Sequence, residues 1–241
     1  MISLPPAMTD TGERRAWFDT SDRLELVATI VMAAAAIFTA WAAFQSAKWS
    51  GIQAIEFSQA NAARVESTRF DARANQLRSI DVDVFLSWLD AVGAEVQSGQ
   101  TTIDPEVGYV PVDGTLSAFY FVRMRDEFKP ALDAWLETRP LIDPDAPQTP
   151  FQMAEYSLAD AAHAQILVGE AEGHSEAALT ANQNSDNHVL TAVALALAIF
   201  FAGISSKLNA RSNRLGAISL AVVIFLGAAV VLGFLPKVSP F

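Results

Sequence analysis

Cysteine is absent from the 241 residues of this protein. This absence excludes disulfide bonds, thiolate metal sites and cysteine nucleophiles. The sequence also lacks a phosphate-binding glycine loop, a nucleophile elbow and the zinc-protease pattern of two histidines four residues apart around a glutamate. We therefore expect no catalytic residue, no metal site and no cofactor.

Charged residues are absent from three long apolar stretches: Leu26–Ala47 (22 residues), Val189–Ser206 (18 residues) and Leu215–Leu235 (21 residues). At a rise of about 1.5 Å per residue, a helix of this length crosses a hydrocarbon core of about 30 Å. The pattern predicts an all-α integral membrane protein with transmembrane helices at 24–47, 189–206 and 215–235. The first stretch is longer than the apolar region of a cleaved twin-arginine signal, so we interpret it as an uncleaved anchor.

Basic residues near the ends of the apolar stretches predict the orientation. The N-terminal segment 1–23 carries three arginines, and the loop 207–214 has three basic residues and no acidic one. Both are expected in the cytoplasm, with the spans in a bacterial inner membrane. This places residues 48–188 and the tail 236–241 outside the cytoplasm. Tryptophans at both ends of the first span are the expected interface anchors: Trp17, Trp41 and Trp49.

Small residues recur at alternating spacings of three and four in two polar segments, which is a heptad seam. The first seam consists of Ala60, Ala63, Ser67, Phe70, Ala74 and Leu77. The second consists of Ala154, Ser157, Ala161, Ala164, Val168, Ala171, Ser175 and Ala178. We expect transmembrane helices 1 and 2 to extend out of the membrane as an antiparallel hairpin, capped by a small helical domain at about residues 80–150. The alanine-rich spans also suggest a homo-oligomer.

Polar side chains cluster where the two long helices would enter the membrane: Gln45, Lys48, Asn182, Asn184, Asp186, Asn187 and His188. One interpretation is a polar collar at the lipid headgroups. The other is the outer mouth of a cation-permeable pore formed by several copies. No predicted span contains a charged residue or a buried histidine, which argues against a proton-coupled transporter.

The segment 48–188 is acidic, with 9 basic and 22 acidic residues and therefore a net charge of −13. Such a domain disfavours nucleic acid and favours cations or a basic protein partner. Two pairs of residues share a helix face at metal-site spacing: Asp160 with His163, and Glu170 with His174. Two loops carry several carboxylates: Asp104, Glu106 and Asp113 in one, Asp143 and Asp145 in the other. We interpret them as solvated side chains, because none reproduces a known ligand pattern.

The layout resembles uncharacterised bacterial inner-membrane proteins with one N-terminal span, a helical outer segment and two C-terminal spans. Trp41, Gln45 and Trp49 carry this resemblance, together with the stretches 185–187 and 200–203. The resemblance implies architecture and no chemistry. The leading hypothesis is an oligomeric envelope protein whose outer helical domain binds or organises a partner. The alternatives are the pore, with Asp186 at its mouth, and a membrane-tethered hydrolase that uses His163 or His174.

Overall fold

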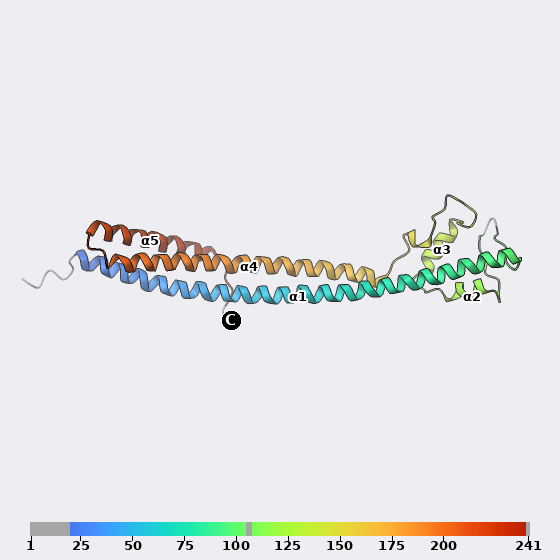
Figure 1. Ribbon diagram of the computed structural model, residues 1–241, viewed down its shortest axis with the longest axis horizontal. Coiled ribbons are helices and arrows are strands. Elements are labelled where there is room, and N and C mark those ends of the chain that lie inside the picture. The colour runs from blue at the N-terminus through green and yellow to red at the C-terminus, as the bar shows by residue number, and fades with distance from the viewer. Residues whose placement is uncertain (1–19, 105–107, 240–241) are drawn as a thin grey trace, which may run out of the picture. The chain divides into compact units, whose positions relative to one another are not determined.

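The computed structural model describes residues 20–104 and 108–239. These residues form five α-helices and one short 3-10 helix: α1 Thr20–Ser98, α2 Leu116–Arg123, α3 Lys129–Glu137, η1 Pro150–Gln152, α4 Ala159–Ser205 and α5 Arg211–Phe234 (Figure 1). The described part of the sequence holds no strand beyond one isolated bridge between Asp104 and Gly108. The all-α prediction is therefore confirmed. By length and composition, α1, α4 and α5 are the three helices able to cross a membrane.

Helix α1 extends beyond its predicted end. The sequence placed a boundary near residue 80, with a separate cap helix after it, but α1 continues without a break to Ser98. No proline interrupts these 79 residues, and neither Gly51 nor Gly93 ends the helix. Gly99, at φ +71°, ends it, and the Gln100 N–H then donates to the Glu95 carbonyl at 2.9 Å. This left-handed glycine is a usual helix C-terminal signal.

The described residues divide into two compact units, which we treat separately: unit 1 comprises those within 1–57 and 176–241, and unit 2 comprises those within 58–175. In unit 1, α5 lies beside α4 and the N-terminal part of α1 (Figure 1). Small side chains fill the contact. One buried cluster contains Ala28, Val31, Ala202, Ile218 and Ala221, and a second contains Ala35, Leu195 and Ala228. Alanine side chains allow helix backbones to approach closely.

In unit 2, α1 and the first part of α4 run in opposite directions. The Ser67 hydroxyl donates to the Ala164 carbonyl at 3.0 Å, and farther along α1 Arg73 pairs with Asp160 at 3.1 Å. The first predicted seam is only partly right, because Ala60, Ser67 and Ala74 are buried and Ala63, Phe70 and Leu77 are half-buried. The second seam needs a correction. Ala164, Ala171 and Ala178 are buried, but Val168 is exposed and Leu167 takes its place, while Ala154 and Ser157 precede the helix.

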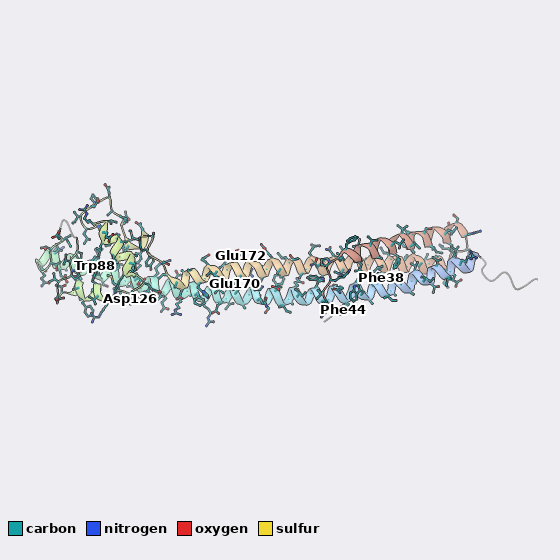
Figure 2. All side chains as sticks on the ribbon, turned by 180° about the vertical axis from the view of Figure 1, so that it is seen from behind. Phe38, Phe44, Trp88, Asp126, Glu170 and Glu172 are labelled. Carbon is teal, nitrogen blue, oxygen red and sulfur yellow. The ribbon has the colours of Figure 1, made fainter. Side chains whose placement is uncertain are left out.

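The core of unit 2 is aromatic and surrounds the C-terminal part of α1. Trp88 is fully buried, and its ring lies 5.0 Å from that of Tyr109 and 5.9 Å from that of Phe85 (Figure 2). The other buried members are Val92, Met124, Phe128, Leu132 and Trp135. These large side chains supply the buried apolar area that the small seam residues of α1 lack.

An ion pair joins α1 to the segment between α2 and α3. Arg125 donates two hydrogen bonds to the buried Asp81 carboxylate, at 2.8 and 2.9 Å, and the Tyr156 hydroxyl adds a third at 3.1 Å. The hydrogen bonds to Asp81 raise the pKa of Arg125 above its usual range. Burial, followed by the charge of Asp81, raises the pKa of Tyr156. The Asp81 carboxylate thus joins α1 to two segments distant in the sequence, one at Arg125 and one at Tyr156.

Candidate functional site

The predicted polar collar separates into an inner and an outer set of side chains. The inner set forms hydrogen bonds between elements of unit 1 or is buried there, and we call it the polar layer: Gln45, Ser46, Ser50, Ser185 and His188, with tail residues 236–239. In the outer set, Lys48 and Asp186 are exposed, and Asn182, Asn184 and Asn187 are half-buried. The two sets have different partners and are described in turn.

Gln45 binds the backbone of the protein's own tail. Its side chain is 0% exposed, its Oε1 accepts from the Val238 N–H at 2.9 Å, and its Nε2 donates to the Val238 carbonyl at 3.1 Å. The Trp49 indole N–H donates to the Pro236 carbonyl at 3.2 Å. The tail follows the end of α5 and is not helical. The Val238 N–H and the Pro236 and Val238 carbonyls therefore have no partner within a helix. The amide of Gln45 therefore satisfies backbone groups that would otherwise be unpaired.

Three serines form a second contact between α1 and α4. The Ser185 hydroxyl lies 2.9 Å from that of Ser46 and 3.0 Å from that of Ser50, and also donates to the Ser46 carbonyl at 3.1 Å. Small hydroxyl side chains combine close helix approach with a hydrogen bond across the contact. These serines were not among the predicted site residues, although their spacing of four on α1 was visible in the sequence.

His188 is fully buried and only half satisfied. Its Nδ1 lies 2.8 Å from the Asn184 carbonyl oxygen, which can only accept, so Nδ1 carries the proton. The other ring nitrogen, Nε2, is buried and has no hydrogen-bond partner among the described residues. His188 precedes the predicted second span by one residue, so the prediction that no span contains a buried histidine does not cover it, yet it lies inside unit 1.

The side-chain contacts of the outer set are made along single helices. The ammonium group of Lys48 lies 5.9 Å from the centroid of the Phe44 ring (Figure 2). Asn182 donates to the exposed Asp186 at 3.2 Å, and Gln183 donates to Asn187 at 3.1 Å. These pairs lie one turn apart on α4, where such amide and carboxylate contacts are common.

The predicted interface anchors have different surroundings. Trp41 remains partly exposed, with its ring 5.6 Å from that of Phe44. Trp49 is half-buried and bound to the tail. Trp17 lies outside the described residues. An anchoring role in the lipid interface stays a prediction for all three.

Unit 2 carries an exposed apolar stripe on α2, which we call the α2 surface: Leu116, Phe119, Val122 and Arg123. The three apolar side chains are 54%, 48% and 66% exposed, and they recur every three residues along one face. An open cavity of about 530 Å³ lies along them and continues past Asp113 to the Thr115 end of the helix. Isolated exposed apolar residues are ordinary, but a contiguous stripe beside a cavity is typical of an interaction surface.

A buried carboxylate holds α2 in place. Glu95 of α1 accepts from the Ser117 N–H at 2.9 Å and from the Ser117 hydroxyl at 2.5 Å, at the N-terminal end of α2. Thr101 donates to the same carboxylate at 3.3 Å. Burial alone raises the pKa of Glu95, but these hydrogen bonds outweigh it and hold the pKa below its ordinary value of 4.5. The α2 surface is therefore presented by a fixed helix.

Arg123 lies against the aromatic ring of the α2 surface. Its guanidinium carbon is 3.7 Å from the centroid of the Phe119 ring, and one of its N–H groups donates to the Phe119 carbonyl at 3.4 Å. Among the described residues, no carboxylate forms an ion pair with Arg123, because the ion pairs of this unit involve other cations: Arg69, Arg73, Arg125 and Lys129.

The two residue pairs at metal-site spacing, Asp160 with His163 and Glu170 with His174, do not belong to a larger group of ligands among the described residues. Asp160 pairs with Arg73, while the ring of His163 packs on Phe70 at 4.4 Å. Glu170 projects from α4 (Figure 2). The Asp145 N–H donates to Asp143 at 2.9 Å, which is a local turn contact. Among the described residues there is no group of three or more potential ligands. Glu106 lies outside them.

Comparisons with protein families, with curated proteins and with solved structures find no match to this sequence. The resemblance to three-span inner-membrane proteins therefore stays a prediction.

Proposed function

We propose that this protein is a bacterial inner-membrane protein without catalytic activity, whose unit 2 stands outside the cytoplasm and binds a protein partner. The observation that carries the proposal is the α2 surface. Folding normally buries apolar side chains, because removing apolar surface from water stabilises the protein by about 25 cal/mol per Å². The apolar stripe of α2 stays exposed, although a buried carboxylate fixes the helix in place. This exposure supports a role in binding another molecule.

The membrane arrangement is part of the proposal and is supported by the three long apolar helices and by the basic residues near their ends. In this proposal α1, α4 and α5 cross the bilayer, the N-terminus and the loop after α4 lie in the cytoplasm, and residues 48–188 lie outside. The extensions of α1 and α4 form the antiparallel hairpin that carries the cap. The polar layer then lies at the outer headgroup region, where Gln45 and Trp49 hold the tail close to the bundle.

The binding test uses the full-length protein in lipid nanodiscs. The probe is a pool of six-residue peptides with lysine at two fixed positions for solubility, and alanine, leucine, valine or phenylalanine at the other four. Retained peptides are measured by mass spectrometry. We expect Val122→Ser to reduce retention and Val65→Ser to leave it unchanged, since both valines are similarly exposed, at 66% and 61%, but Val65 lies on α1. Equal retention by the two variants, or none by the natural protein, would contradict the proposal.

Oligomerisation is a separate part of the proposal. Some of the small residues are packed within one copy, as the fully buried Ala35 and Ala42 show. Others in the same span are exposed, namely Ala36, Ala40 and Ala43. These exposed alanines are the ones that would contact a second copy. Mass photometry in mild detergent tests this directly, and a clean monomer would remove the oligomer from the proposal.

A cation-permeable pore is the second candidate, and the exposed Asp186 favours it. The centre of unit 1 is filled by alanine and leucine, so a pore would have to form between copies, with the outer set of polar residues at its mouth. Liposome flux distinguishes this case. Asp186→Asn should lower cation flux and Asp186→Lys should shift selectivity toward anions. If neither the natural protein nor the variants conduct, the pore is excluded.

A further inference from the structure

We infer that the α2 surface recognises an apolar segment that carries one carboxylate, with Arg123 as the receptor for that carboxylate. The inference rests on the proposed function and adds the chemistry of the partner. It begins from the position of Arg123, whose guanidinium is stacked on Phe119 at the edge of the apolar stripe.

The stacking orients the guanidinium for recognition. An arginine side chain has five N–H donors in a rigid plane, and a carboxylate binds two of them side by side. Only one donor of Arg123 is directed to the backbone, at the Phe119 carbonyl. Because the ring of Phe119 covers one face of the guanidinium, the edges of the plane remain for a ligand. Arginine and aromatic residues are also enriched among binding hot spots.

The surrounding charge sets a limit on the ligand. Unit 2 contains 8 basic and 19 acidic residues in positions 58–175, a net charge of −11. Asp113 lies at the rim of the same cavity. A segment with several acidic residues would be repelled by this field, whereas a single carboxylate meets the one cation that lines the cavity. The rest of the segment should be neutral or basic.

The cavity has a suitable size for such a segment. Its volume of about 530 Å³ falls in the range of about 300–1,000 Å³ that ligand pockets occupy. Leu116 and Val122 line it beside Arg123, so apolar side chains and the carboxylate would be bound together. A free carboxyl terminus that follows an apolar residue has this combination.

The test compares two forms of the peptide pool on the full-length protein in nanodiscs. One form ends in a free carboxylate and the other in an amide, so the two differ only at that group. We expect the natural protein to retain the carboxylate form at least about threefold better, as an exposed to partly buried ion pair would provide. Arg123→Gln should abolish this preference and leave retention of the amide form unchanged.

Arg69→Gln is the matched control, because it removes one positive charge from the same unit at a site paired with Glu66. It should keep the preference for the carboxylate form. Equal retention of both forms by the natural protein, or loss of the preference in Arg69→Gln as well, would overturn the inference and leave the proposed function standing. Absence of retention for both forms would instead overturn the proposed function.

Discussion

Gln45 and Val238 are joined by two hydrogen bonds across 193 positions of the sequence. The side-chain amide of Gln45 pairs with the N–H and the carbonyl of Val238 as one strand residue pairs with another. This contact lies next to the indole of Trp49, which binds the Pro236 carbonyl. The tail is thereby held against α1 at the level where α5 stops.

Gln45→Leu should release the tail. The two backbone groups of Val238 would lose their partners, and each hydrogen bond contributes about 1 kcal/mol. Because the sequence has no cysteine, Val238→Cys supplies a unique thiol while leaving the backbone contact intact. We expect maleimide to label this thiol about ten- to thirtyfold faster when Gln45→Leu is added, because two hydrogen bonds are lost. Trp49→Phe removes only one bond and should give a smaller increase. Equal labelling rates in all three would show that the contact does not hold the tail.

Asp81→Ala should weaken unit 2 strongly. It would leave Arg125 partly buried without its main partner, and breaking a buried pair in this way costs about 3–5 kcal/mol. Tyr156→Phe removes one hydrogen bond to the same carboxylate and should cost about 1 kcal/mol. Hydrogen exchange of residues 84–92 in the full-length protein measures both effects. A loss below about 1 kcal/mol for Asp81→Ala would contradict the role of this carboxylate.

Acid should loosen α2 through Glu95. The pKa of this carboxyl is lower in the folded protein than its ordinary value of 4.5, so the unfolded state binds the proton more readily. The stabilisation is complete above about pH 4.5 and is lost as the pH falls through the folded pKa. Hydrogen exchange of residues 116–123 should accelerate in this window. Glu95→Gln should remove the acceleration, and an unchanged pH profile in that variant would assign the effect to another group.

His188→Leu should be tolerated in spite of its complete burial. The imidazole Nε2 has no partner among the described residues, and the Asn184 carbonyl that Nδ1 contacts belongs to a helix. Replacing a half-satisfied polar group by an apolar one of similar size is often neutral. We expect a change in Tm below about 4 °C, which corresponds to about 1 kcal/mol for a protein of this size. A larger loss would indicate that Nε2 has a partner in the membrane.

Several parts of the fold could be predicted because they depend on local pattern. The uncharged stretch from Leu26 to Ala47 is long enough for a span, and α1 covers it. The spacing of Ala60, Ser67 and Ala74 predicted which face of α1 is buried. The second seam was harder, because positions three and four residues apart are both neighbours on a helix. The choice between Leu167 and Val168 depended on the opposing helix.

The two candidate sites were predicted to different degrees. Polar residues at the membrane entrance were visible, but not that Gln45 and His188 turn inward while Asp186 turns outward. The α2 surface was not predicted. Phe119 and Val122 stand among many other apolar residues at 80–150, so composition does not single them out.

The sequence by itself determined the all-helical class, the three apolar helices and the acidity of the segment between the first two spans, because length, composition and periodicity act through local physics. Only the tertiary structure decided which side chains meet. The tail pairs with Gln45, Glu95 holds α2, and Arg123 stacks on Phe119 at the surface. The first two contacts join distant segments, and the exposure of the third depends on how α2 packs against α1. No local sequence pattern encodes which face of a short helix remains uncovered.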